Sequence, residues 1–168
     1  MTIDEFYSLP EEVRRHELFK CCGCSSWVTQ MLNKPRAMDL DEVMDQAKLA
    51  WRTSSKADWL EAFSHHPKIG DIESLKEKFA STAQWALGEQ ESVKAAPQNV
   101  IAALAEENRR YEDKFGFIFI VCATGKSSEE MLVALQHRLK NSSTEELQIA
   151  AQEQLKITKL RIQKLFTS

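Results

Sequence analysis

The sequence has 168 residues, of which 43% are hydrophobic and 28% are charged, so it can bury the core of one domain and does not resemble a disordered chain. Its net charge is −3 and its basic residues are scattered, which argues against a nucleic-acid-binding surface. It contains no apolar run of the roughly 18 residues that would span a membrane, and it does not open with a secretory signal. We therefore expect a single domain, residues 1–168, in the cytoplasm, with neither nucleic acid nor membrane as a partner.

The four cysteines are consistent with a reducing compartment. Cys21, Cys22 and Cys24 are crowded together and Cys122 stands alone, and such close neighbours make poor partners for structural disulfides. A zinc site that uses the three clustered cysteines and His16 is the alternative. No second Cys/His cluster with metal-binding spacing completes four ligands, so we expect buried thiols and no metal.

Helix start signals recur along the chain, whereas five glycines and four prolines leave little material for hairpin turns. In Ser8-Leu9-Pro10-Glu11, the serine is expected to cap the helix that follows. Asp39 precedes apolar residues at helical spacing from Leu40 to Trp51. Further helices are predicted from Pro97 to Gly116, from Ser127 and from Ser142. The sequence thus predicts an all-α fold, a compact single-domain helical bundle.

Two stretches interrupt this helical pattern. The first is residues 64–71, where Pro67 bars a continuing helix and Gly70 suits a turn. The second is the apolar segment at residues 115–123, which has the local character of a strand. Because a lone strand leaves its backbone groups unpaired, we expect either an extended core segment or the start of the next helix.

The last predicted helix has a core-facing stripe whose members are three or four residues apart: Leu147, Ala151, Leu155, Thr158, Ile162 and Leu165. Arg161 lies at the border of this stripe. Its aliphatic stem can rest on the core while its guanidinium reaches the rim of a pocket. The alternative is an arginine that extends into water or pairs with a surface acid.

Two short motifs suggest chemistry. His66 precedes a proline, which holds it in place, and an imidazole can transfer protons near neutral pH. The alternative is a turn histidine that only binds backbone carbonyls. Glu89 can accept hydrogen bonds from ligand N–H groups and Gln90 can donate and accept, which suits a urea- or amide-like compound. Alternatively, both lie on a solvated helix face.

Together these motifs resemble a known family, the 2-oxo-4-hydroxy-4-carboxy-5-ureidoimidazoline (OHCU) decarboxylases of uric acid degradation. His66-Pro67-Lys68-Ile69-Gly70 is similar to the family's HPxIG signature, and Glu89-Gln90 is similar to its EQ pair. The run from Phe115 to Val121 resembles the family's FGFPFV(I) segment. Cys21-Cys22-Gly23, followed by Trp27, is similar to an early segment of the family. Arg161-Ile162 lies where the family has an Arg-Leu pair near its C-terminus. The motifs follow the family's order over nearly the whole chain.

The resemblance implies an all-α carboxy-lyase that needs no cofactor and converts a small ureidoimidazoline substrate, OHCU, to (S)-allantoin and CO₂. It implies that His66 is the catalytic acid. It assigns substrate binding to Pro67, Glu89, Gln90, Phe119, Ile120, Val121, Cys122, Ala123 and Arg161. Homodimers are known in the family, so the resemblance also allows a homodimer here.

The sequence departs from the family pattern at a few positions. Ala86 replaces a serine that would contribute a hydroxyl, Glu91-Ser92 replaces a pair of small residues, and Ile118 replaces a proline. A non-catalytic helical interaction module remains the alternative function, and it predicts a sizeable exposed apolar patch. The decarboxylase assignment predicts instead that His66, Glu89 and Arg161 converge on one cavity.

Overall fold

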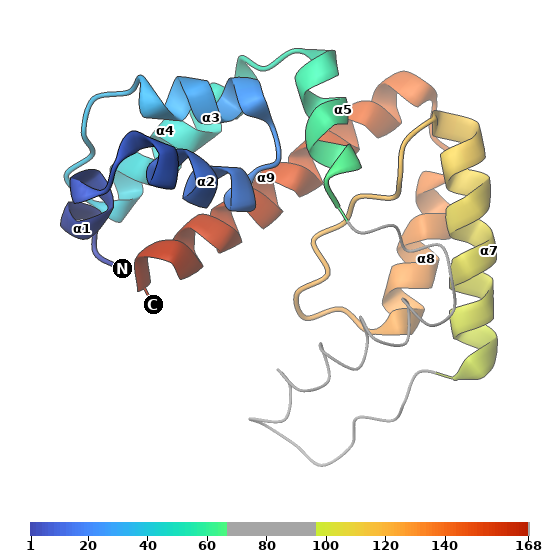
Figure 1. Ribbon diagram of the computed structural model, residues 1–168. Coiled ribbons are helices and arrows are strands. Elements are labelled where there is room, and N and C mark those ends of the chain that lie inside the picture. Colours follow the sequence, from blue (N-terminus) through green and yellow to red (C-terminus); the bar gives the residue numbers. More distant parts are fainter. Residues whose placement is uncertain (67–96, 168) are drawn as a thin grey trace. The chain divides into compact units, whose positions relative to one another are not determined.

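The computed structural model describes residues 1–66 and 97–167, and these ranges contain eight helices and no strand (Figure 1). The chain divides into two compact units. The first unit comprises Met1–His66, Ile120–Cys122 and Ala151–Ser168, and the second comprises Pro67–Phe119 and Ala123–Ala150. The predicted all-α class is confirmed, whereas the single domain over residues 1–168 stays a prediction. No helix within the described ranges is both long enough and apolar enough to cross a bilayer.

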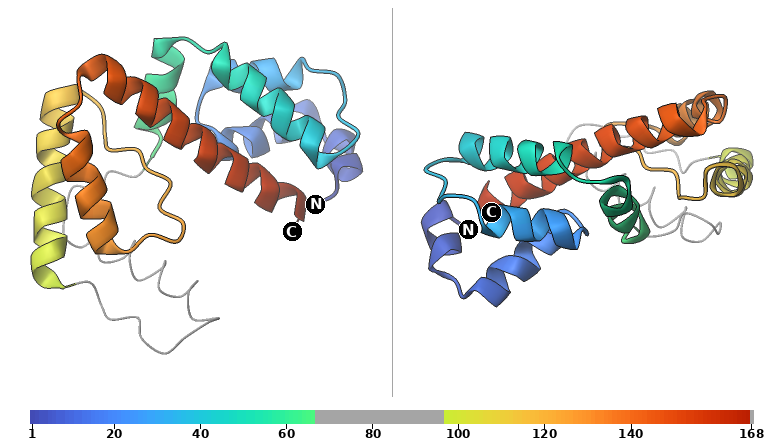
Figure 2. Two further views of the ribbon diagram at one scale, coloured as in Figure 1. Left: turned by 180° about the vertical axis from the view of Figure 1, so that it is seen from behind. Right: turned by 90° about the horizontal axis from the view of Figure 1, so that it is seen from above.

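The first unit is built on the C-terminal part of the longest helix, α9 (Ser143–Thr167). Its other helices are α1 (Ile3–Ser8), α2 (Glu11–Cys21), α3 (Ser25–Leu32), α4 (Leu40–Arg52) and α5 (Lys56–Ser64). The first four lie beside the red C-terminal half of α9 in Figures 1 and 2. The Met1 ammonium donates to the Leu165 carbonyl at 3.0 Å, so the N-terminus is held against the end of α9.

Several helix ends follow the predicted capping. The Asp39 side chain accepts from the Glu42 N–H at 2.9 Å, and α4 begins at the next residue. The role predicted for Ser8 is wrong. An earlier helix, α1, begins after a capping box formed by Thr2 and Glu5, so Ser8 becomes its last residue and donates to the Asp4 carbonyl. Helix α2 still follows as expected, but Pro10 is its N-cap and supplies no side-chain hydrogen bond.

Two tryptophans join the helices of the first unit. Trp27 on α3 is fully buried, and its indole Nε1 donates to the Ala47 carbonyl on α4 at 3.0 Å. Trp51 on α4 donates in the same way to the Ala151 carbonyl on α9 at 2.8 Å. A buried indole needs an acceptor for its N–H, and here each acceptor belongs to the neighbouring helix. These bonds orient α3 and α4 relative to the C-terminal part of α9.

The second unit contains α7 (Gln98–Phe115), α8 (Ser128–Arg138) and the first residues of α9. Helices α7 and α8 lie side by side (Figures 1 and 2). As predicted, α7 starts after Pro97 and ends at Gly116, whose φ of 75° is the left-handed conformation that glycine adopts readily. Ser127 forms the capping box of α8, also as predicted.

The apolar segment near residues 115–123 is an extended core segment. Helix α7 includes Phe115, so the segment begins one residue later than predicted, and residues 118–123 are neither helix nor strand. Its buried members are Phe117, Phe119, Ile120 and Val121. The local strand character does not lead to a sheet because the described residues contain no second strand to pair with it.

Candidate active site

His66 lies just beyond the end of α5 and contacts α9. Helix α5 ends at Ser64, before Pro67, in accordance with the restriction that proline places on the preceding residues. The backbone N–H of His66 donates to the Phe63 carbonyl at 3.2 Å. Its half-buried imidazole places Nε2 2.5 Å from Oε1 of Gln154 on α9. The histidine that the sequence singled out is therefore held by both its backbone and its ring.

A chain of buried polar groups continues from this contact. Gln154 is fully buried, and its Nε2 donates to Oγ1 of Thr158, one turn further along α9, at 3.2 Å. The Thr158 side chain in turn interacts with the buried thiol of Cys22. Burial raises the pKa of the Cys22 thiol to about 12, although the hydrogen bond from Thr158 opposes this shift. The thiol is thus protonated at neutral pH and acts as a structural group.

Arg161 is on the same face of α9 as this chain, because it follows Thr158 by three residues and Gln154 by seven. Its Nη1 donates to the Lys20 carbonyl at 3.2 Å, near the end of α2. Carbonyls in the last turn of a helix lack intrahelical donors and carry partial negative charge, so a guanidinium stabilises them. The described residues therefore give this cation a main-chain partner rather than a surface carboxylate.

The neighbouring His65 is held by close packing. Its ring makes an edge-on contact with Phe19 at a centroid distance of 4.9 Å. A Cβ added at Gly23 would lie only 2.5 Å from the Cβ of His65, a distance that real Cβ atoms essentially never show. Gly23 thus permits the loop between α2 and α3 to approach the end of α5. This close approach helps to position His66.

The predicted substrate-binding segment 119–123 falls in both units. Ile120, Val121 and Cys122 belong to the first unit, where the Cys122 N–H donates to Oε2 of Glu153 on α9 at 2.8 Å. Phe119 and Ala123 belong to the second unit. There, the guanidinium of Arg138 lies over the buried Phe119 ring at 4.6 Å. The backbone N–H of Cys122, one of the residues assigned to substrate binding, is therefore bonded to a carboxylate.

The remaining predicted site residues, Pro67, Glu89 and Gln90, lie outside the described residues, as does Ala86. The expected convergence of His66, Glu89 and Arg161 on one cavity stays a prediction. Of these three, His66 and Arg161 belong to the first unit and are associated with one face of α9.

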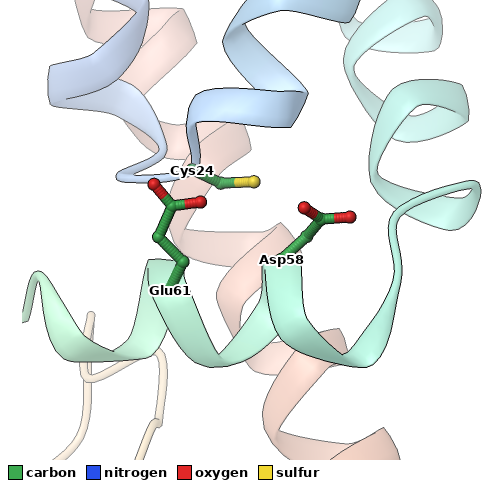
Figure 3. Close-up of side chains that lie close together, drawn as sticks. All are labelled: Cys24, Asp58 and Glu61. Carbon is green, nitrogen blue, oxygen red and sulfur yellow. The ribbon is translucent and has the colours of Figure 1, made fainter.

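A separate group of side chains has the composition of a metal site. Cys24, Asp58 and Glu61 point toward one another (Figure 3), and their donor atoms lie within 4.8 Å. Each group already has a structural partner: Cys24 accepts from the Trp27 N–H, Asp58 from Ser55, and Glu61 from Ser25. Burial raises the pKa of the Cys24 thiol, and the two carboxylates raise it further. This group shares only Cys24 with the zinc site considered above and is explained by helix capping.

Sequence reasoning did not identify Gln154 as part of the site. Gln154 follows Ala151 by three residues and precedes Thr158 by four, so it belongs to the core-facing stripe. An amide at a core-facing position needs buried partners, and this signal was available in the sequence. Its actual partner, His66, is 88 residues away, and only the fold brings the two together.

The chain as a whole is similar to known proteins. The family model for OHCU decarboxylase matches residues 7–163. A protein of Arabidopsis thaliana, "Uric acid degradation bifunctional protein TTL", is 39% identical over 159 residues, which are 93% of this chain and 48% of that protein. The chain thus spans about half the length of this relative.

Two further matches cover most of both partners. The 2-oxo-4-hydroxy-4-carboxy-5-ureidoimidazoline decarboxylase of Haloferax volcanii is 26% identical over 145 residues, 86% of this chain and 83% of that protein. A crystal structure of OHCU decarboxylase in the presence of (S)-allantoin is 41% identical, with a TM-score of 0.73, and covers 90% of this chain and 98% of that one. The chain belongs to the OHCU decarboxylase family.

Proposed function

We propose that this chain decarboxylates OHCU to (S)-allantoin and CO₂ and needs no cofactor for the reaction. The observation that carries the proposal is the likeness, over nearly the full length of both chains, to an OHCU decarboxylase crystallised in the presence of (S)-allantoin. The contact between His66 and α9 supports it independently, because a histidine that is to protonate one face of an intermediate must be held in position.

The chemistry requires a place for an electron pair and a source for a proton. As the bond to the carboxylate breaks, CO₂ leaves and the electron pair remains on the ring carbon. The neighbouring carbonyl and ring nitrogens can delocalise this pair. His66 then gives a proton to that carbon from one side, which forms the new C–H bond and sets the configuration of allantoin.

The other proposed residues bind and orient the substrate. Along α9, Arg161 lies seven residues beyond Gln154, the partner of His66, which is about 10 Å of helix and suits a small molecule with polar groups at both ends. Arg161 stabilises negative charge at the carboxylate or carbonyl end. Glu89 binds ring or ureido N–H groups, and Gln90 contributes to substrate binding beside it. Substrate contacts are also assigned to Pro67, Phe119, Ile120, Val121, Cys122 and Ala123.

The proposed function is tested by measuring which enantiomer of allantoin forms. OHCU is generated from urate in the same cuvette, and circular dichroism reports whether allantoin forms as the S enantiomer. We expect this chain to accelerate formation of (S)-allantoin, and we expect His66→Asn to lower kcat by about 10²–10⁴-fold. His137→Asn, on an exposed position of α8, is the matched control and should behave like the parent. If allantoin forms no faster with the parent protein than without it, and forms as a racemate, the proposal is refuted.

We also propose, on the family resemblance, that the chain can form a homodimer, which light scattering of the purified protein tests. A monomeric mass at micromolar concentration would contradict it. That the chain acts in the cytoplasm stays a prediction from the sequence. The alternative of an interaction module has less support. The most exposed large apolar side chains among the described residues are Val13, Met38, Leu49 and Val133, which are spread over α2, the residues before α4, α4 itself and α8. Such scattered residues are normal on a protein surface.

A further inference from the structure

We propose that Gln154 is a positioning residue for His66: it holds the imidazole as the Nε2–H tautomer and thereby makes Nδ1 the nitrogen that exchanges the catalytic proton. The tautomer follows from the hydrogen bonds of the first unit alone. Its catalytic consequence rests on the proposed function.

The direction of the hydrogen-bond chain determines which atom of the Gln154 amide faces the imidazole. A hydroxyl oxygen can accept a hydrogen bond, and the Thr158 oxygen faces the Gln154 amide one turn earlier on α9. Nε2 of Gln154 donates to that oxygen at 3.2 Å. The carbonyl Oε1 of the same amide is consequently turned toward His66, where it lies 2.5 Å from Nε2.

An amide carbonyl can only accept, so Nε2 of His66 must carry a hydrogen. A neutral imidazole has one N–H, and when Nε2 carries it, Nδ1 holds the lone pair. When His66 takes up a second proton, that proton is on Nδ1. In the proposed reaction, the Nδ1–H bond breaks as the C–H bond of allantoin forms, and the Nε2–H bond to Gln154 persists throughout.

Burial makes the orientation of the amide matter. Gln154 is fully buried and Thr158 is 1% exposed, so water cannot substitute for a lost partner, and a buried polar group without a partner is costly. Rotating the amide by half a turn would turn its N–H toward Nε2 of His66, and the imidazole would then have to carry its hydrogen on Nδ1. The structure has the first arrangement, with Nε2 of Gln154 directed at Thr158 and Oε1 directed at His66.

The uncharged character of this partner matters for an acid. A carboxylate at position 154 would hold the imidazolium by charge attraction and disfavour release of its proton, whereas an amide orients the ring without adding charge. The geometry therefore suits a histidine that must give up a proton readily.

The tautomer can be measured directly, without substrate. Long-range ¹H–¹⁵N spectra of the full chain labelled at histidine are recorded well above the ordinary imidazole pKa of about 6.5, and the His66 signals are assigned by their loss in His66→Asn. We expect the parent to show the Nε2–H pattern for His66. A parent spectrum with the Nδ1–H pattern, or with averaging between both tautomers, would overturn the inference.

Variants of α9 test the role of the amide. Gln154→Leu keeps the size of the side chain but removes the acceptor, so His66 should show averaged tautomers. Gln152→Leu, on an exposed position of the same helix, is the matched control and should leave the His66 signals unchanged. If Gln154→Leu leaves the Nε2–H pattern intact, Gln154 does not position the ring.

Thr158→Val supplies a second test, and it decides the matter if Gln154→Leu does not fold. Valine has the shape of threonine but cannot accept a hydrogen bond from Gln154. The amide then loses its fixed orientation, so His66 should show averaged tautomers although Thr158 does not contact it. If this variant keeps the Nε2–H pattern of the parent, Thr158 does not determine the orientation of the amide.

Turnover separates this inference from the proposed function. Gln154→Leu is expected to lower kcat by about 10–100-fold, the loss that is typical when a metal-binding histidine loses its outer hydrogen-bond partner, and to leave KM within about twofold. A variant that turns over like the parent would refute the catalytic consequence. A parent that produces no (S)-allantoin, yet shows the Nε2–H pattern, would refute the proposed function and leave the tautomer assignment standing.

Discussion

Replacing Gly23 with alanine is expected to displace the end of α5 and, with it, the candidate catalytic histidine. The new Cβ would lie 2.5 Å from the Cβ of His65 and 2.9 Å from its Cγ, whereas ordinary contact begins near 3.4 Å. The distance between the two Cβ atoms would thus be about 0.9 Å too short. Because a Cβ is fixed to the backbone, no change of the His65 rotamer can relieve it, and one of the two backbones must move.

The magnitude follows from the cost of overpacking. Extra methyl groups in close-packed sites typically cost about 1–3 kcal/mol, and each kcal/mol lowers the melting temperature of a chain of this size by about 2–4 °C. Gly23→Ala should therefore lower the melting temperature by about 2–12 °C. His66 follows His65 directly, and a misplacement of about 1 Å at a reacting group can cost about 10²-fold in rate. We expect the rate of (S)-allantoin formation to fall accordingly.

Calorimetric melting and the chirality assay measure the two effects on one sample. The matched controls are second changes at His65 in the Gly23→Ala background. His65→Gly removes the clashing Cβ and should restore much of the loss, whereas His65→Ala retains that atom and should not. If Gly23→Ala melts and turns over like the parent, the close approach does not position His66 and the reasoning is wrong.

Three further predictions concern other parts of the molecule. Glu146→Gln should destabilise the second unit by about 3–5 kcal/mol in urea unfolding, because it leaves the buried guanidinium of Arg138 without its carboxylate partner. Burial raises the pKa of Cys21 to about 11 and that of Cys22 to about 12, whereas thiols of the unfolded chain have pKa values near 9. The unfolded chain therefore loses these protons first, and stability should fall as the pH rises from about 9 to about 12. Arg161→Met should weaken allantoin binding in calorimetric titration while costing no more than about 1 kcal/mol of stability, because it keeps the apolar stem and loses one exposed hydrogen bond.

Each of these predictions has a control. For the buried pair, Glu145→Gln changes an exposed neighbour on α9 and should cost little, and a loss below about 1 kcal/mol in Glu146→Gln would contradict the first prediction. For the thiols, Cys22→Ala should reduce the loss of stability with rising pH, and an unchanged loss would show that other groups cause it. For Arg161, Lys164→Met changes an exposed cation on the same helix, and an equal loss of binding there would show that only net charge matters.

Much of the fold could be predicted from the sequence because helix ends depend on local chemistry. Asp39, Ser127 and Gly116 act within one turn of their own positions, so their patterns identify helix boundaries without knowledge of the rest of the chain. The same locality explains the error at Ser8. A capping pattern six residues earlier, at Thr2, competes for this residue and starts α1.

The histidine of the candidate site could also be named from the sequence, since His66 precedes a proline within a motif of a known family. What the sequence could not supply is its environment. The Gln154 amide, the Gly23 contact of His65 and the Lys20 carbonyl that binds Arg161 are distant in the chain, and each depends on how helices pack. Tertiary structure also decided that the apolar segment after Gly116 remains extended, because its backbone finds no second strand among the described residues and its side chains are buried in the core. Local hydrogen bonds and steric preferences are determined by neighbouring residues, whereas the partner of a buried polar group is determined by which surfaces the fold brings within 3 Å of it.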